Sequence, residues 1–517
     1  MSDTPPSVRR VVVIGGGVSG LAAAHRLREL QAQEPKLRES PLEVLLLEAS
    51  GRPGGTVRTE RREGFLVECG PDSFISEKPA ALELAKRLGL GGRIIETNEG
   101  HRRSFVVRGG RLIETNEGQR RSFDVRGGRL RPTPEGFQLL APSRLLPFLT
   151  TDIFTWRGKA RMALDLVLPR RGGANGQDDE SLAAFVRRRL GREALERMAQ
   201  PMVGGIYTAD PESLSLRATM PRFLEMERRD RSLILAMWRA GRRAAEDARH
   251  GRGASGARYS LFLSFDEGVQ VLTDALAARL AADSVRLNTR VSSLRPRPGA
   301  RGWVLTTEAG ETFDADAVCL ALPAHASARL LRDVDDALAD ELDAIPYAST
   351  ATVNLAYRRP DVPHPLDGFG FVVPFVERRA TLACTFSSVK FKGRAPEGHA
   401  LLRAFVGGAL QPEMFALDEG PMVEAVRRDL RDLLGVEAPP LFAHVEKWPR
   451  SMAQYHLGHA ARVARLRERL RQRPTLALCG NAFDGAGLPD CVRGGEAAAE
   501  SLAAEVGHFK SAGGLQR

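Results

Sequence analysis

The sequence Val-Val-Val-Ile-Gly-Gly-Gly-Val-Ser-Gly occupies residues 11–20 and decides the fold of the N-terminal region. Its four apolar residues predict a buried strand, and the Ala- and Leu-rich stretch 21–30 predicts a helix. A second apolar run, residues 44–47, ends in Glu48. A strand, a glycine turn, a helix and a second strand closed by an acid form the unit that binds a dinucleotide. We therefore predict a Rossmann-like domain here rather than an ordinary glycine-rich turn.

Each glycine of this turn has its own predicted role. Gly15 permits the tight turn, Gly17 lets a pyrophosphate approach the backbone, and Gly20 lets the helix pack on the strand. The free N–H groups at the start of the helix attract the phosphates. Glu48 can accept a hydrogen bond from a ribose hydroxyl, and its charge would repel a 2′-phosphate. The pattern therefore favours FAD or NAD over NADP.

Two further stretches favour FAD. Residues 51–59, Gly-Arg-Pro-Gly-Gly-Thr-Val-Arg-Thr, directly follow the ribose-binding acid and can wrap the pyrophosphate from its other side. Flavin oxidoreductases of the amine-oxidase type carry such a loop, whereas NAD dehydrogenases do not generally need it. Near the C-terminus, a strand at 475–479, a glycine-containing turn and a helix at 491–506 are predicted. The N-terminus of that helix could stabilise negative charge on a reduced flavin, or the helix could be purely structural.

Composition narrows the class of protein. The chain has 517 residues and a net charge of +11, which suits two or three domains. The charge could favour anionic membranes, nucleic acid or acidic small molecules, or the preference for Arg over Lys could simply reflect a GC-rich genome. We see no nucleic-acid module, no apolar run of the ~18 residues that would span a bilayer and no signal peptide, so we expect a cytoplasmic protein. The five cysteines form no Cys-x-x-Cys pair, so we expect neither metal nor disulfide chemistry.

Two segments in the middle of the chain leave alternatives open. Residues 95–112 and 113–130 are a tandem repeat in which each copy predicts a short strand. The repeat could be an inert surface insertion, or its copies could compete for one strand position. Residues 137–171 are apolar with Arg and Trp at their edges, and helices are predicted at 181–198 and 221–245. This block could lie in a membrane interface or form a buried helical lobe.

Over nearly its full length the chain resembles the FAD-dependent, oxygen-dependent protoporphyrinogen oxidases, a family that includes bacterial coproporphyrinogen III oxidases. The most specific matches are Gly-Ile-Tyr at 205–207, Gly-Phe-Gly-Phe at 368–371, Gln-Tyr-His-Leu-Gly-His at 454–459 and Pro-Asp-Cys at 489–491. The full matching stretches are 15–24, 47–59, 68–74, 204–216, 366–374, 386–396, 448–459 and 480–491.

This resemblance implies an α/β plus α+β fold with three parts. These are a Rossmann-like FAD-binding domain (1–95, 258–335 and 442–517), a mixed-sheet substrate-binding domain (96–129, 229–257 and 336–441) and a helical membrane-associating lobe (130–228). FAD would be the cofactor, no metal would be bound, and no catalytic side chain is assigned.

The resemblance also implies the site residues. The cofactor-binding set is Gly15, Gly16, Gly17, Val18, Ser19, Gly20, Glu48, Ala49, Thr56, Gly70, Pro71, Asp72, Ser73, Val291, Trp448, Ala486, Gly487 and Leu488. The substrate-binding set is Gly205, Thr208, Phe369, Val372 and an arginine for a substrate propionate, either Arg103 or Arg121. Arg121 is preferred because its copy of the repeat joins the family-like Arg-Pro at 131–132 directly.

The implied reaction is the six-electron oxidation of protoporphyrinogen IX to protoporphyrin IX with O₂ as acceptor. Oxidation of coproporphyrinogen III to coproporphyrin III is the alternative. Another flavin oxidase or desaturase, and a binding protein of the prenyl-escort type without FAD, are more distant alternatives. The expected partners are the porphyrinogen, O₂ and an anionic membrane surface on its cytoplasmic side. We expect no nucleic acid and a monomer or homodimer.

Overall fold

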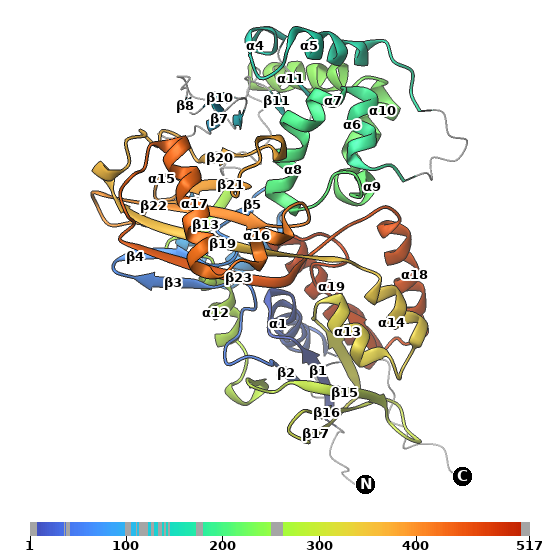
Figure 1. Ribbon diagram of the computed structural model, residues 1–517. Helices are drawn as coiled ribbons and strands as arrows, with labels where there is room; N and C mark the ends of the chain where they lie inside the picture. The colour runs from blue at the N-terminus through green and yellow to red at the C-terminus, as the bar shows by residue number, and fades with distance from the viewer. Residues whose placement is uncertain are drawn as a thin grey trace, which may run out of the picture.

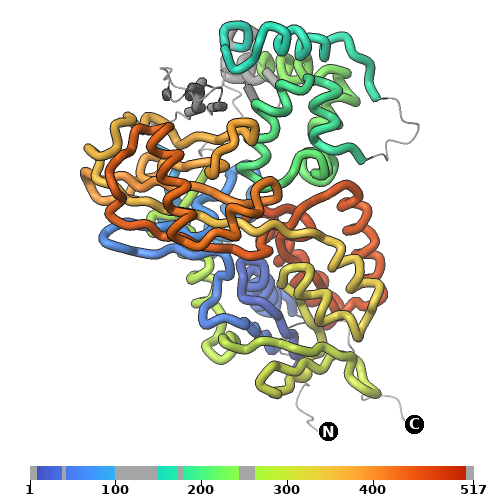
Figure 2. Tube along the Cα trace, in the orientation of Figure 1, coloured from blue at the N-terminus to red at the C-terminus, as the bar shows by residue number. Residues whose placement is uncertain are grey.

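A computed structural model gives the architecture. It describes residues 8–35, 37, 42–98, 145–171, 179–249 and 262–507, together with short strands between residues 105 and 142. The chain forms three bodies stacked in one direction, with a helical lobe at one end, a large mixed sheet in the middle and a nucleotide-binding sheet beside the termini (Figures 1 and 2). The predicted fold class is confirmed, whereas the predicted domain boundaries stay predictions.

The nucleotide-binding body is built on a five-stranded parallel sheet. Its strand order is β14 (Val285–Arg286), β2 (Leu42–Leu47), β1 (Arg9–Ile14), β18 (Ala317–Leu320) and β24 (Leu476–Leu478). Successive side chains of a strand point to opposite faces. Val11 and Val13 accordingly pack with helices α1 (Val18–Gln33) and α19 (Leu488–Gly507). Val12 and Ile14 pack on the other side, in a cluster with the antiparallel strands β15 (Val291–Pro296), β16 (Trp303–Thr307) and β17 (Thr312–Ala315).

Several smaller elements complete this body. The helix expected at 491–506 begins earlier, at Leu488, because Pro489 fits the first turn of a helix, where no N–H is needed. The remaining elements are β3 (Thr59–Arg62), β4 (Phe65–Glu68), β5 (Phe74–Ile75), α3 (Ala80–Arg87), β6 (Ile94–Glu96), β13 (Phe262–Phe265), α12 (Gln270–Ala278), α13 (Ala324–Leu331), α14 (Asp336–Asp343) and α18 (His459–Arg471).

The middle body is the predicted mixed sheet, and it has nine strands. The path runs β23 (Phe442–Ala453), β19 (Tyr347–Arg358), β22 (His399–Gly407), β21 (Ala383–Phe386), β20 (Gly370–Val372), β7 (Phe105–Gly109), β10 (Arg129–Pro132) and β9 (Phe123–Val125), with β8 (Arg111–Leu112) beside β7. Only the β20–β7 pair on this path is parallel. Helix α17 (Glu419–Leu434) packs its apolar side on one face. The shorter helices α15 (Ser387–Lys390) and α16 (Pro412–Ala416) flank the sheet.

The strand order separates the two copies of the tandem repeat. Strand β7 belongs to the first copy and lies beside β20, whereas β9 belongs to the second copy and lies at the end of the path. The two copies therefore occupy different positions in one sheet rather than sharing one.

The third body is a helical lobe. Its helices are α4 (Leu145–Thr150), α5 (Trp156–Ala163), α6 (Leu182–Arg189), α7 (Arg192–Ala194), a π-helical turn (Leu195–Ala199), α8 (Gln200–Tyr207), α9 (Leu216–Thr219), α10 (Pro221–Asp230) and α11 (Leu233–Arg249). The helices predicted at 181–198 and 221–245 are present, but Gly191 (φ +93°) and Arg231 (φ +66°) leave the helical conformation and break each stretch in two. Among the helices that the structure describes, none has the length and apolarity to cross a bilayer.

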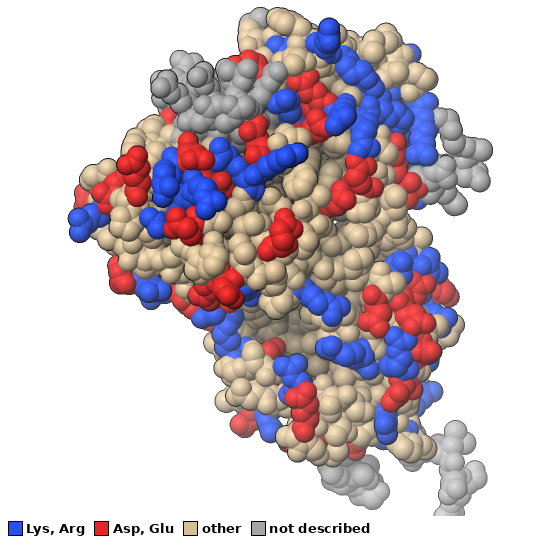
Figure 3. Space-filling view, viewed as in Figure 1, with Lys and Arg blue, Asp and Glu red and all other residues tan. Residues whose placement is uncertain are grey.

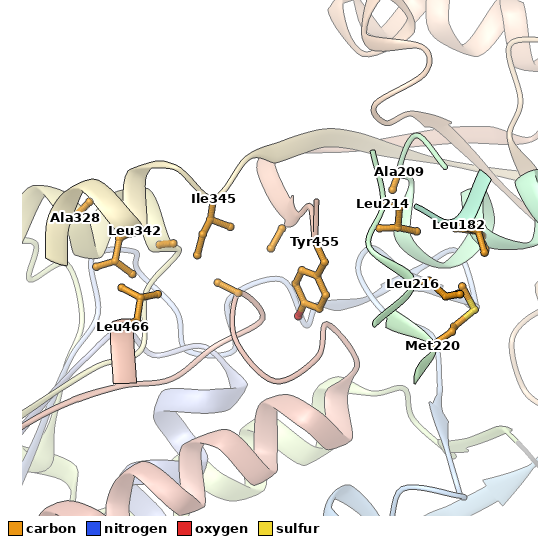
Figure 4. Packing of buried hydrophobic residues seen from close by; sticks show 14 of the residues in the cluster. Leu182, Ala209, Leu214, Leu216, Met220, Ala328, Leu342, Ile345, Tyr455 and Leu466 are labelled. Carbon is orange, nitrogen blue, oxygen red and sulfur yellow. The ribbon is translucent and has the colours of Figure 1, made fainter. Parts of the chain in front are cut away.

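The lobe is joined to the nucleotide-binding body by the segment 454–459. The Ser215 N–H donates to the Tyr455 carbonyl at 2.8 Å, and the Leu457 N–H donates to the Ser213 carbonyl at 2.9 Å. Figure 4 shows the Tyr455 ring between Ile345 on one side and Leu214 on the other, within one continuous apolar cluster. The family-like motif at 454–459 thus connects two bodies.

Candidate active site

At two positions of the first turn, contacts within the protein leave room only for glycine. Gly15 has φ +106°, and a Cβ there would lie 2.5 Å from the Ala321 carbonyl oxygen. A Cβ on Gly20 would lie 1.9 Å from the Gly15 carbonyl oxygen. Both distances are far below van der Waals contact, so the tight turn and the close helix packing expected of these glycines are present.

Gly17 is different, because nothing in the described chain explains why it is a glycine. Its φ of −69° and ψ of 176° are open to any residue, and no atom lies within 4 Å of an ideal Cβ at this position. The backbone is bare at the start of α1, where helix N–H groups attract an anion. This open surface fits the pyrophosphate of a dinucleotide.

The second glycine loop lies against the first. The Gly54 N–H donates to the Gly16 carbonyl at 2.7 Å, and Gly54 pairs with Gly17 in a parallel bridge. Arg52 holds this loop, because its guanidinium donates to the carbonyls of Pro53 (3.1 Å), Val57 (3.0 Å) and Gly55 (2.6 Å). The sequence analysis did not single out Arg52, whose role depends on the folded path of the loop.

The predicted ribose acceptor stands at the end of β2. The Glu48 carboxylate accepts hydrogen bonds from the N–H groups of Gly16 at 2.6 Å and Ser50 at 2.8 Å. The Thr289 N–H donates to the Glu48 carbonyl at 2.8 Å, and this bond brings the following strand, which starts at Val291, to the same place. Glu48, its neighbour Ala49 and Val291 are therefore gathered at one end of the glycine turn.

The segment 69–73 continues the site from the second loop. A Cβ on Gly70 would lie 1.7 Å from the Thr56 carbonyl oxygen, so only glycine allows this approach. The Trp448 indole N–H donates to the Cys69 carbonyl at 2.9 Å. The predicted flavin-side residues Thr56, Gly70 and Trp448 are thus brought together from three separate parts of the chain.

Asp72 is held as a half-buried anion. Its carboxylate lies 2.9 Å from Lys390 Nζ and 3.9 Å from Arg403, and it accepts a hydrogen bond from the Ser73 hydroxyl at 2.8 Å. Burial would raise the pKa of Asp72, but the two neighbouring cations hold the pKa well below its ordinary value. Arg403 also donates to the Gly70 carbonyl. Sequence reasoning missed Lys390 and Arg403, since they lie more than 300 positions away and no local pattern marks them.

The start of α19 closes the other side of the site. A Cβ on Gly495 would lie 2.2 Å from the Ser19 carbonyl oxygen, so α19 packs tightly against the first turn of α1. Lys78 Nζ lies 2.5 Å from Asp490 Oδ2 and ties this helix to the loop after Ser73. The predicted residues Ala486, Gly487 and Leu488 precede or open α19 at this point.

The predicted substrate residues lie where the helical lobe meets the mixed sheet. A Cβ on Gly205 would lie 3.8 Å from Val372 Cγ1. Thr208 ends α8 in a left-handed conformation (φ 49°), and its carbonyl accepts from the Ala409 N–H at 2.8 Å. Phe369, directly before β20, and Val372 are both half-buried. Gly205, Thr208 and Val372 therefore come together.

The two candidate propionate arginines, Arg103 and Arg121, lie outside the described residues. The backbone pairing places Phe105 and Val106, from the first copy of the repeat, opposite Phe371 and Val372 of β20. This order puts the strand that follows Arg103 beside the substrate residues. Both arginines stay predictions.

Comparison with known proteins agrees with this geometry. Coproporphyrinogen III oxidase of Propionibacterium freudenreichii is 37% identical over 93% of this chain and 88% of its own length. Protoporphyrinogen oxidase 1 of Arabidopsis thaliana is 30% identical over 97% of this chain and 88% of its own length. The crystal structure of an Exiguobacterium sp. 255-15 protein, assigned provisionally as a protoporphyrinogen oxidase, superposes with a TM-score of 0.79 at 30% identity, covering 97% of this chain and all of that one.

The model of the flavin-containing amine oxidoreductases matches residues 18–503, which include the second glycine loop, Trp448 and the start of α19. The bare backbone at Gly17 and the acid at Glu48 fit FAD as the cofactor. The chain belongs to the flavin-containing amine oxidoreductase family.

Proposed function

We propose that the protein is an FAD-dependent porphyrinogen oxidase. The observation that carries the proposal is the convergence of cofactor and substrate residues at one end of the mixed sheet. Thr350 of β19 pairs with Trp448 on one side and with Gly407 on the other. The next residue, Gly408, packs against the Thr208 carbonyl, where its Cβ would lie 2.9 Å from the oxygen. A substrate held at Thr208 would therefore lie close to a cofactor held at Trp448.

In this proposal the side chains and backbone of the protein bind the cofactor and the substrate and orient them toward each other. The glycine turn 15–20, Glu48 and the loop 51–57 would hold the ADP half of FAD, and the residues around Gly70 and Trp448 would hold its flavin half. Bound FAD supplies the redox chemistry and passes the electrons to O₂. Half-buried Phe369 and Val372 offer apolar walls to a flat macrocycle,. The propionates would be bound by Arg103 or Arg121.

Two substrates have support. Protoporphyrinogen IX is the substrate that the sequence analysis favours. Coproporphyrinogen III is supported by the higher identity, 37%, to a relative of that name, against 30% for the protoporphyrinogen oxidase. The two differ in vinyl against propionate groups, so the charge of the pocket decides between them. Parallel aerobic assays of the FAD-loaded protein with both substrates, read by porphyrin fluorescence, test the proposal.

We also propose that the helical lobe docks on an anionic membrane from its cytoplasmic side. Trp156 and Val167 are 72% and 68% exposed, and Leu164 is also exposed. The neighbouring cations Arg157 and Arg170 are exposed as well. Figure 3 shows Lys and Arg gathered over this lobe. Exposed apolar side chains among cations are typical of surfaces that insert into the headgroup region.

A pair of matched variants tests the docking. Val167→Ser should reduce co-sedimentation of the protein with vesicles that contain phosphatidylglycerol. Leu441→Ser removes an exposed apolar side chain (42%) from the mixed-sheet body and should leave co-sedimentation unchanged. Equal binding by both variants and the native protein would contradict docking through this lobe. Neither result bears on turnover with a soluble substrate.

A further inference from the structure

One group of side chains, beside the site but outside it, has the composition of a metal centre. Glu60 of β3, Cys69 after β4 and His444 of β23 each offer one ligand atom, and these atoms lie within 4.8 Å of one another. Cys69 Sγ is 3.4 Å from His444 Nε2, and Glu60 Oε2 is 3.7 Å from His444 Nδ1. Thiolate, imidazole and carboxylate are the donors that Zn²⁺ takes in proteins.

The spacing of the three ligand atoms suits a tetrahedral ion. Bonds of about 2.0–2.3 Å at tetrahedral angles place neighbouring ligand atoms roughly 3.5 Å apart. The Cys69–His444 distance already has this value. An ion takes only one ring nitrogen, and Glu60 lies beside Nδ1 rather than Nε2. For an ion at Nε2, the half-buried Glu60 carboxylate therefore has to move from within 4.8 Å to about 3.5 Å of the other ligand atoms, by a rotamer adjustment on its hairpin,.

The local charge also favours a cation. A second carboxylate, Glu446, lies 3.6 Å from His444 Nε2. Arg58 contacts both carboxylates, at 3.0 Å from Glu446 and more closely at Glu60. Among the groups in direct contact, one guanidinium faces two carboxylates, whereas Arg52 and Arg403 act on the thiol from farther away. A divalent ion would balance the excess of carboxylates next to the imidazole.

An unsatisfied buried amide provides an independent observation. Asn354 is fully buried (0% exposed), and neither its side-chain oxygen nor its nitrogen has a hydrogen-bond partner among the described residues. Asn354 is paired directly with His444 across β19 and β23, and directly opposite residues project from the same face of a sheet. Thr352 lies two residues before Asn354 on the same face, and its hydroxyl donates to the Cys69 carbonyl at 3.1 Å. The free amide oxygen therefore lies on the face that carries His444 and meets Cys69, where a bound ion or its water would satisfy it.

We propose that Glu60, Cys69 and His444 bind a thiophilic divalent cation of the Zn²⁺ class, with Glu446 and Asn354 beside it. As the sulfur–metal bond forms, the Cys69 thiol releases its proton to solvent. The site joins the β3–β4 hairpin to β23 and directly precedes Gly70, so the ion would fix the segment that leads to the flavin half of the cofactor site. The lack of a Cys-x-x-Cys pair led us to expect no metal, but that criterion detects only ligands that are close together in the sequence. These three ligands come from three separate segments.

The test uses the full-length, FAD-loaded protein after removal of metals with a chelator. Titration calorimetry with Zn²⁺ should give one site per chain. Cys69→Ala and His444→Ala should each weaken binding by about tenfold or more. Cys384→Ala, which removes a buried thiol from strand β21 of the mixed sheet, and His399→Ala, which removes a histidine from strand β22 of that sheet, should bind Zn²⁺ as the native protein does. Titration with Co²⁺ should add a thiolate-to-cobalt absorption band to the difference spectrum, and this band should be lost in Cys69→Ala alone among the cysteine variants.

Two outcomes would overturn the proposal. One is a native protein that shows neither stoichiometric Zn²⁺ binding nor the thiolate-to-cobalt band. The other is a band that survives in Cys69→Ala. Flavin absorbance and melting temperature report whether each variant is folded. If His444→Ala does not fold, Glu60→Gln on the half-buried hairpin takes its place and should weaken Zn²⁺ binding in the same way. None of these readings depends on the substrate or on turnover.

Discussion

Replacing Gly17 with alanine should weaken FAD binding and leave the stability of the apoprotein nearly unchanged. The backbone at Gly17 is extended, and a methyl group there meets no atom within 4 Å. Alanine reduces the freedom of the unfolded chain, which stabilises the protein by about 0.4–1 kcal/mol. It is also a poorer N-cap than glycine, by roughly 0.5 kcal/mol. These effects oppose each other, so we expect a change in unfolding free energy below about 1 kcal/mol.

The effect on the cofactor should be larger. The added methyl takes the place through which the pyrophosphate approaches the helix N-terminus, and such overpacking costs about 1–3 kcal/mol. Because 1.4 kcal/mol corresponds to tenfold in affinity, the Kd for FAD should rise by roughly 5- to 150-fold. Titration of the apoprotein with FAD, followed by quenching of flavin fluorescence, measures this change. Urea unfolding of the apoprotein measures the stability.

Gly20→Ala is the matched control, because its Cβ would lie 1.9 Å from the Gly15 carbonyl oxygen. This variant should destabilise the apoprotein itself by about 3 kcal/mol or more. Two results would refute the reasoning: a Gly17→Ala protein that binds FAD as tightly as the native one, or an apoprotein of that variant destabilised as strongly as Gly20→Ala.

Three further changes have defined outcomes. Asp165→Ala should destabilise the protein by about 3–5 kcal/mol in urea unfolding, because it leaves the fully buried Arg189 guanidinium, now 2.6 Å from Asp165, without its carboxylate; an unchanged midpoint would contradict this. Glu48→Ala should weaken FAD binding in the same fluorescence titration, because the ribose acceptor is lost, whereas Glu43→Ala, an exposed acid on the same strand, should not. Burial and nearby Arg462 lower the pKa of His459 to about 4, so between pH 6.5 and 4 the unfolded state binds more protons than the folded state. Stability should therefore fall by up to about 3 kcal/mol as the pH drops through this window, and His459→Gln should flatten that part of the stability–pH curve.

The nucleotide-binding body could be predicted because its signals are local. The strand, glycine turn and acid of residues 11–48 lie within one supersecondary unit, and the structure places them as expected. The hairpin of β16 and β17 also carries a local signal, because buried apolar side chains alternate along both of its strands. In these segments the alternation of apolar and polar residues and the turn residues are enough to predict which strands and helices lie next to each other.

The remaining features depend on contacts between distant parts of the chain. Lys390 and Arg403 neutralise Asp72 across more than 300 positions, and neither has a local pattern that reveals a partner. The helix break at Arg231 (φ +66°) coincides with a contact from a distant segment, because the Arg231 carbonyl accepts a hydrogen bond from the buried Arg189 at 2.6 Å. The cluster of Glu60, Cys69 and His444 also arises only when the β3–β4 hairpin meets β23. Contacts between distant segments, rather than local helix or strand propensity, determine these features.

The most direct test of the central claim is aerobic turnover of the FAD-loaded protein with protoporphyrinogen IX and coproporphyrinogen III in parallel. We expect porphyrin fluorescence to rise faster than the enzyme-free control with at least one of the two, and the faster substrate identifies the specificity. A yellow, FAD-containing protein that accelerates neither oxidation would contradict the porphyrinogen oxidase proposal and would favour another flavin oxidase or desaturase.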